Sequence, residues 1–193
     1  MKRSGLIILA IVAVLVLWGI STQRGLVNKD EGVKNAWNKV QSEYQQRSDL
    51  VGQLVNTVKG VANFEQKTLT DVVEARAKAT GINISADSLT PENMAKFQQA
   101  QDQLKGSLSR LLVVAEQYPQ LKATENFMKL QGQLEGIENG VKAARNNFND
   151  AVQTYNVKVR SFPGNILAGL FGYKAKEGFK ADAGTEKAPE VKF

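Results

Sequence analysis

The chain has 193 residues, of which 42% are hydrophobic and 23% charged, so it is long enough for one domain with a core of its own. It contains neither Cys nor His. Their absence excludes disulfides, thiolate metal sites, Cys nucleophiles and histidine acid–base catalysis, which removes most common enzyme chemistries. We therefore expect no catalytic residue, no metal site and no cofactor.

The net charge of +6 arises from 25 Lys and Arg against 19 Asp and Glu. Proteins that bind nucleic acid gather their basic residues in one run or on one face. Here these residues are spread along the whole chain among acidic and amide side chains. This pattern is typical of a solvated surface of mixed charge, and we predict no nucleic-acid partner.

An apolar segment follows a short N-terminal tail, residues 1–4. No charged residue lies between Arg3 and Arg24. A helix over residues 5–22 would span about 27 Å, close to the roughly 30 Å hydrocarbon core of a bilayer. We predict a transmembrane anchor over residues 5–23, with Trp18 at an interface, so the lipid bilayer of a cell membrane is the first expected partner.

Two properties of this segment remain open. A cleaved signal peptide is the alternative, because such peptides carry an apolar core of about 7–15 residues and Gly19 and Ser21 offer a weak cleavage site. The basic N-terminus favours a cytoplasmic start, which would place the rest of the chain outside the cytoplasm. Arg24 and Lys29, just beyond the segment, weaken that preference.

The residues that follow are predicted to be all-α. Through residues 27–80 apolar side chains recur at spacings of three and four, and the alternation typical of strands is absent. Residues 27–80 form either one helix or two. A break near Ser48-Asp49-Leu50, with Asp49 as N-cap, would give two helices that match the later ones in length. Gly81 is expected to end this region.

Two further helices are indicated along the chain. Thr90-Pro91-Glu92 carries the signals of a helix start, and Pro119 those of a helix end. A longer pattern of spacings of three and four follows and predicts a helix packed against others: Phe127, Leu130, Leu134, Ile137, Val141, Ala144, Phe148, Val152, Tyr155, Val159 and Phe162. The sequence therefore predicts a transmembrane helix followed by an antiparallel four-helix bundle of long helices in up-down order.

The C-terminal region divides in two. Residues 164–175 are apolar, and the fourth helix of such a bundle would end beside the start of the first, near the bilayer. We expect a group of apolar side chains there to contact the membrane or a partner, or to cover the end of the bundle as a lid: Ile166, Leu167, Leu170, Phe171 and Tyr173. Residues 176–193 lack periodicity and are expected to be disordered.

Several charged residues in the helical region are candidates for ion pairs between helices. A carboxylate–guanidinium network would fix the register of a bundle, and we prefer that role to catalysis. The candidate members are Arg47, Glu74, Arg76, Glu116, Glu138 and Arg145.

Several separated motifs resemble the LemA family. They include Arg47-Ser48-Asp49-Leu50-Val51, then Leu54-Val55-Asn56-Thr57-Val58, and Leu111 to Ala123 with its Glu116-Gln117-Tyr118-Pro119 centre. The resemblance covers residues 24–175, with a LemA-like helical bundle over 24–163. It implies a membrane-anchored bundle without catalytic residues, and partners among other membrane proteins, for example a membrane metallopeptidase.

The leading hypothesis is a non-enzymatic scaffold or adaptor near the membrane. One alternative is a hydrolase or transferase that uses paired carboxylates, which would need a deep pocket holding both groups. The other alternative is a self-assembling structural membrane protein, because the apolar pattern of residues 127–162 could extend between copies.

Overall fold

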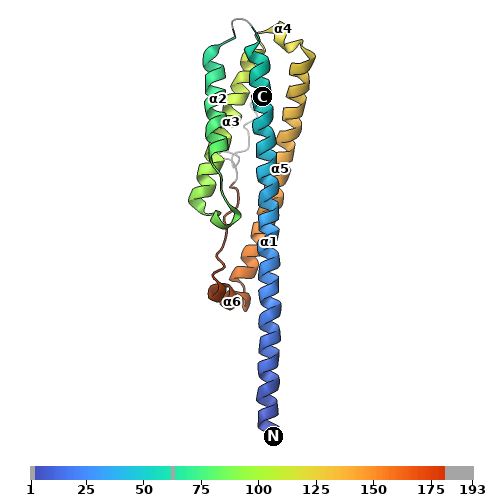
Figure 1. The fold of residues 1–193 in the computed structure, drawn as a ribbon, viewed down its shortest axis with the longest axis vertical. Coiled ribbons are helices and arrows are strands. Elements are labelled where there is room, and N and C mark those ends of the chain that lie inside the picture. The colour runs from blue at the N-terminus through green and yellow to red at the C-terminus, as the bar shows by residue number, and fades with distance from the viewer. Residues whose placement is uncertain (1–2, 62–63, 181–193) are drawn as a thin grey trace, which may run out of the picture.

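The computed structural model describes residues 3–61 and 64–180 and is all-α over these residues, as predicted (Figure 1). The elements in chain order are α1 (Arg3–Lys59), α2 (Gln66–Gly81), the 3₁₀ turn η1 (Ala86–Ser88), α3 (Pro91–Ala115), the short α4 (Pro119–Lys122), α5 (Glu125–Arg160) and α6 (Gly164–Phe171).

The first helix is a single rod of 57 residues, about 86 Å long. The predicted break at Ser48-Asp49-Leu50 is wrong, since α1 continues through these residues and ends at Lys59. Asp49 is not an N-cap, because its carboxylate accepts a hydrogen bond from Gln45 one turn earlier in the same helix. Residues 27–80 thus form two helices, but the first ends at Lys59 and the turn between them begins at Gly60.

The helices that follow begin and end largely at the predicted signals. Thr90 caps α3 by accepting a hydrogen bond from the backbone N–H of Asn93, and α2 ends at Gly81. Thr124 caps α5 in the same way through Phe127. Caps of this kind contribute about 1 kcal/mol each. Phe162, expected in the apolar seam of α5, lies beyond the helix end and is 80% exposed.

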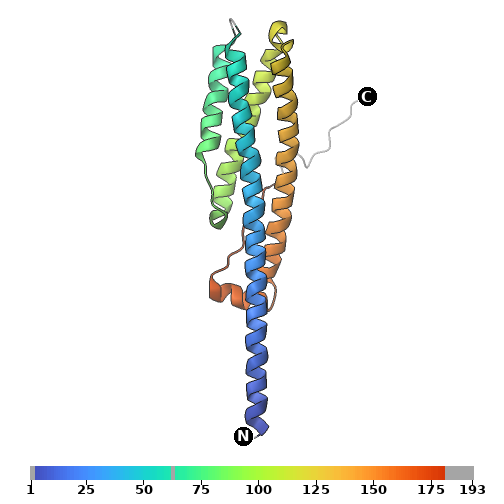
Figure 2. The same cartoon turned by 45° about the vertical axis from the view of Figure 1, so that its right-hand side comes forward.

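Helices α1 and α5 pack along most of the length of α5. Lys158 approaches Gly25, the rings of Phe148 and Trp37 lie 5.1 Å apart, and Asn126 donates a hydrogen bond to the hydroxyl of Thr57. Residue numbers rise along one helix as they fall along the other, so these two helices run in opposite directions. Helices α2 and α3 pack against each other and lie beside this pair, as Figures 1 and 2 show.

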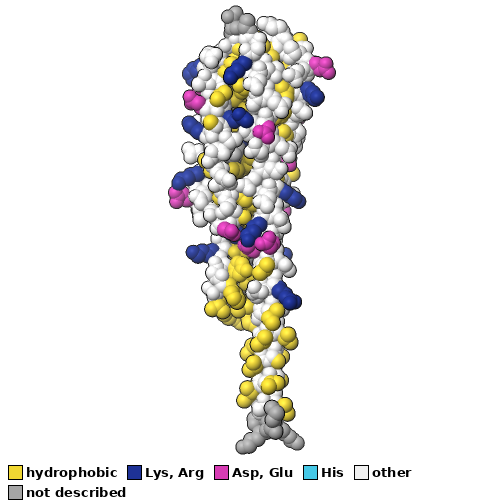
Figure 3. All heavy atoms as spheres, in the orientation of Figure 1, with side chains coloured by type: hydrophobic (Ala, Val, Ile, Leu, Met, Phe, Trp, Pro, Cys, Tyr) yellow, Lys and Arg dark blue, Asp and Glu magenta, His cyan; other side chains and the backbone are white. Residues whose placement is uncertain are grey.

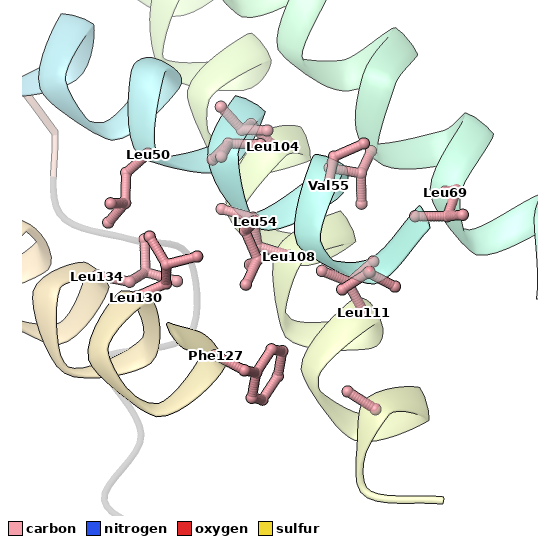
Figure 4. Close-up of a cluster of buried hydrophobic side chains, with 14 of the residues drawn as sticks. Leu50, Leu54, Val55, Leu69, Leu104, Leu108, Leu111, Phe127, Leu130 and Leu134 are labelled. Atoms are coloured by element: carbon pink, nitrogen blue, oxygen red, sulfur yellow. The ribbon is translucent and has the colours of Figure 1, made fainter. Parts of the chain in front are cut away.

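The core consists of two apolar clusters stacked along the long axis. The first lies at the end distant from the N-terminus and draws on α1, α2, α3 and α5; Figure 4 shows ten of its labelled side chains, among them Leu54, Leu108 and Phe127. The second surrounds Trp37, which is fully buried and donates its indole N–H to the carbonyl of Ile84 at 2.7 Å. Burial of such side chains contributes roughly 1.5–3 kcal/mol each.

The chain does not leave the bundle after α6. Residues 174–180 follow an extended path along α5, and the side chain of Phe179 is buried in the second cluster. We call residues 174–180 the strap. The expectation that disorder begins at residue 176 is therefore wrong for residues 176–180, because α5 supplies polar partners for their backbone. Residues 181–193 of that expected tail lie outside the described residues.

Candidate functional site

The N-terminal part of α1 exposes an unbroken apolar surface. Its large hydrophobic side chains between Leu6 and Ile20 are each 37–67% exposed, and α1 is long and apolar enough to cross a membrane. Thr22 and Leu26, two and six residues further on, are buried against the rest of the molecule. The transition from exposed to packed surface therefore falls at the end of the predicted span, residues 5–23.

Helix α6 lies beside α1 at this transition and adds to the exposed apolar surface (Figure 1). Ile166, Leu170 and Phe171 are exposed, Leu170 to 75%, and Phe162 just before the helix is exposed as well. Of the five residues predicted to make a membrane or partner contact, Leu167 and Tyr173 instead pack against the second cluster. We call Phe162, Ile166, Leu170 and Phe171 the α6 surface.

The space-filling view shows that these apolar side chains gather at one end of the molecule. In Figure 3 hydrophobic side chains cover the narrow lower part and the adjoining base of the bundle, whereas charged side chains are scattered over the rest. A patch of this kind on an otherwise polar protein marks contact with a membrane or with another protein.

Two glycines fix the position of α6. A Cβ atom at Gly164 would lie 2.5 Å from the backbone carbonyl oxygen of Lys158, so only glycine permits this approach of α6 to the end of α5. At the other end Gly172 has a φ of 76°, a left-handed conformation that ends the helix. This turn directs the chain from α6 back along α5.

The strap is held through its backbone by side chains of α5. The amide of Asn156 accepts from the N–H of Lys176 at 2.9 Å and donates to its carbonyl at 2.8 Å. The amide of Asn149, about two turns earlier, pairs in the same way with Phe179, at 2.8 and 3.2 Å. The hydroxyl of Tyr155 donates to the carbonyl of Lys174. Each Asn thus pairs with one strap residue as a neighbouring β-strand would.

Side chains of the strap provide two further anchors. The ring of Phe179 lies 6.1 Å from that of Trp37 and 5.6 Å from that of Phe148, and the guanidinium of Arg145 stacks 4.6 Å above it. The ammonium of Lys176 forms an ion pair of 2.6 Å with Asp30 on α1, where both side chains are about nine-tenths buried.

Electrostatics favour the charged form of Asp30. Burial raises the pKa of this carboxyl group, but hydrogen bonds and charge from Lys176 and Lys34 outweigh that effect, so that the net pKa is lowered from its usual 3.8. Burial also raises the pKa of Tyr155 to about 12, so the hydroxyl that holds Lys174 remains a donor at neutral pH.

The predicted ion-pair network forms at one position. Arg47, 2% exposed, pairs with Glu138 at 3.1 Å and donates to the backbone and side chain of Gln101. These three residues come from α1, α5 and α3 and lie between the two apolar clusters. Nε of Arg47 is buried without a hydrogen-bond partner among the described residues.

The other predicted members lie apart from this pair. Arg76 donates to the carbonyl and hydroxyl of Ser48, which joins α2 to α1. Glu116 pairs with Lys122 at the far end of the bundle, and Arg145 contacts the strap. Glu74 is exposed on α2 and forms no ion pair with another described residue. The six charges therefore do not form one network.

A cleft of about 400 Å³ lies between α1, α2 and α3. Its polar lining consists of amides and hydroxyls, including Gln41, Gln45, Asn83 and Gln101, and contains no carboxylate. This chemistry can form hydrogen bonds with a ligand, but it does not supply the paired acids that the hydrolase hypothesis requires.

The strap is the feature that the sequence interpretation missed. Two signals were present: Phe179 is an isolated aromatic residue within a polar tail, and Asn149 and Asn156 repeat on the same side of a helix. Neither signal identifies a partner by itself, because surface Asn residues and single aromatic residues are common. The pairing becomes evident only when the turn at Gly172 places the tail beside α5.

Comparisons with known proteins agree with the motifs. The family model of the LemA family matches residues 36–193. The chain is 24% identical over 149 residues to Protein LemA of Metamycoplasma hominis, covering 77% of this chain and 64% of that protein. It is 32% identical over 74 residues to Magnetosome protein MamQ 2 of Paramagnetospirillum magneticum, covering 38% of this chain and 27% of that protein.

A second magnetosome relative gives a similar match. Magnetosome protein MamQ of Magnetospirillum gryphiswaldense is 32% identical over 73 residues, again 38% of this chain and 27% of the relative. The alignments thus span just under two thirds of the Metamycoplasma protein and about a quarter of the magnetosome proteins. Since the family model covers most of the chain, from α1 to its C-terminal end, this protein belongs to the LemA family.

Proposed function

We propose that this protein is a single-pass membrane protein whose α1, α2, α3 and α5 form an antiparallel up-down four-helix bundle, and that the bundle serves as a non-enzymatic scaffold or adaptor at the bilayer surface. The observation that carries the proposal is the continuity of apolar surface from the exposed part of α1 onto α6. Residues 5–23 would cross the bilayer, with the bundle outside the cytoplasm.

The α6 surface would then be a second membrane contact. Helix α6 packs on α1 next to the predicted end of the span, so its exposed side chains would lie at the height of the lipid headgroups. Four large apolar side chains exposed to water at one place are costly, and contact with headgroups and upper acyl chains would remove that cost. The partners of the bundle are proposed to be other membrane proteins.

The arrangement of the carboxylates supports a scaffold over an enzyme. Glu138 is bound to Arg47 between two apolar clusters, a position that fixes the register of three helices. Asp30 is bound to Lys176 and Lys34, and its pKa is lowered rather than raised. General acids and bases near neutral pH need a raised carboxyl pKa, so Asp30 suits structural pairing better than catalysis.

Site-specific photo-cross-linking in intact membranes tests the proposal. A photoreactive residue at Leu170 should form lipid adducts, and a matched residue at Val113, exposed near the opposite end of the bundle, should not. The scaffold role further predicts protein adducts of defined mass from bundle positions. Equal lipid adducts from both positions would contradict the second membrane contact, and no protein adduct from any bundle position would contradict the scaffold role.

A further inference from the structure

The strap occupies its groove in the way that an extended peptide occupies a recognition site. Asn149 and Asn156 bind the backbone of the strap, so these contacts do not depend on the sequence of the bound segment. The pocket around the side chain of Phe179 provides a contact that does depend on that sequence. Peptide-recognition domains divide their contacts in the same manner. The groove is formed by residues of α1, α3 and α5, so it is a property of the bundle rather than of the strap.

At three positions of the strap, the contacts with the groove depend on which residue is present. Lys176 is selected by Asp30, and Phe179 by the aromatic rings around it. Gly178 is selected by space, because a Cβ atom there would lie 2.7 Å from the side-chain oxygen of Asn149. The groove therefore fits the pattern Lys-x-Gly-Phe in an extended conformation.

The fourth position, Lys180, carries a positive charge beside a cleft that is itself lined by basic residues. Lys180 lines a cleft of about 690 Å³ together with Lys105, Lys142 and Arg145. The one carboxylate in that lining, Glu138, is already paired with Arg47. The ammonium of Lys180 lies 3.9 Å from Glu177 of the strap itself and is mostly exposed. An acidic side chain at this position would meet the basic cleft with the complementary charge.

We propose that this groove is a docking site for an extended segment of another protein with the pattern Lys-x-Gly-aromatic-acidic, and that the strap is a resident occupant which such a segment displaces. This inference rests on the proposed scaffold role and names the chemistry of its partner. A second copy of the chain is the weaker occupant, because its strap carries the same basic Lys180 and is held in its own groove by α6 and Gly172.

Peptide binding to the full-length protein in lipid nanodiscs tests the proposal. The labelled probe is a peptide of residues 174–180 with Lys180→Glu; the native peptide and a probe that also carries Phe179→Ala are the controls. The protein variants Phe179→Ala and Gly178→Ala weaken the resident strap, the first by removing its anchor and the second by the clash with Asn149. Circular dichroism confirms that each variant retains its helices.

Both variants should bind the probe saturably, and wild type more weakly because its strap competes. The probe should bind about threefold or more tightly than the native peptide, with the difference shrinking in high salt, and about tenfold more tightly than the Phe179→Ala probe. Absence of saturable binding to both helical variants, or equal binding of all three peptides, would overturn the proposal. Neither result would affect the lipid adducts from Leu170.

Disulfide trapping checks the alternative occupant. Gln153 on α5 and Glu177 on the strap line the same cleft, and the chain has no cysteine of its own. One population carries Gln153→Cys and another Glu177→Cys, reconstituted together. The proposal predicts no more disulfide between the two populations than a control pair with Gln153→Cys and Lys129→Cys gives. An excess would identify a second copy as the occupant and overturn the proposal.

Discussion

At the scale of single residues, a few buried polar groups define how the helices meet. Arg47 and Gln101 are buried, Arg47 pairs with the one-third exposed side chain of Glu138, and each of the three comes from a different helix. A shift of α1 or α5 by a turn would separate the pair and leave a buried guanidinium without its carboxylate, at a cost of several kcal/mol. This layer therefore specifies register more than it adds stability.

The Arg47–Glu138 pair gives the first prediction. Glu138→Gln should lower the free energy of unfolding by about 2 kcal/mol, because Arg47 keeps an acceptor but loses its compensating charge in a buried site. Glu135→Gln, on the exposed side of the same helix, should change it by less than about 0.5 kcal/mol. Denaturant unfolding of the full-length protein in detergent measures both, and equal effects would contradict the assigned role.

Asp30 gives a prediction for pH dependence. Its folded pKa is lowered below 3.8, so the stability that it contributes is fully present above that value and is lost as the pH falls through the folded pKa. A spin label at Glu177→Cys should be immobile at neutral pH and become mobile only as the pH falls below 3.8, through the lowered pKa of Asp30. Asp30→Asn should make the label mobile at neutral pH already. If neither the fall in pH nor this substitution alters the mobility of the label, Asp30 does not anchor the strap.

At the scale of elements, sequence signals located helix boundaries wherever a cap determines them. Thr90 and Gly81 were interpreted correctly because their effects are local, whereas Pro119, expected to end a helix, begins α4 after α3 has ended at Ala115. The break assigned to Asp49 was wrong because Ser48 and Leu50 are buried against other helices, and tertiary packing outweighs a weak N-cap signal. The local sequence did not mark the true end of α1, at Lys59, more strongly than it marked the incorrect break at Asp49.

Glycines in α6 give a prediction at this scale. Gly164→Ala should destabilise the protein and displace α6, because the added Cβ meets the carbonyl of Lys158 at 2.5 Å. Gly169→Ala is the matched control: nothing lies within 4 Å of its Cβ, and alanine in a helix should stabilise by about 0.5–1 kcal/mol. Thermal unfolding of both variants measures the difference, and a neutral Gly164→Ala would show that α6 does not depend on this approach.

At the scale of the whole molecule, the protein is a long rod. Its N-terminal end exposes apolar side chains, whereas charged side chains are scattered over the rest. Composition and periodicity predicted its all-α class, its apolar N-terminal helix and the apolar segment after α5, because these depend on residue type alone. The strap and the groove depend on which side chains of α5 face a returning tail, and this is decided by the tight approach at Gly164 and the turn at Gly172. Those determinants operate between distant parts of the chain.

The most direct test of the membrane-anchored account uses the two tryptophans, Trp18 and Trp37. In vesicles with brominated acyl chains, Trp18 should be quenched strongly, whereas Trp37, buried among Phe97 and Phe148, should not. Trp18→Phe and Trp37→Phe separate the two signals. Strong quenching confined to Trp18 is the predicted result; emission from Trp18 that brominated lipid leaves unchanged would contradict the placement of α1 in the bilayer.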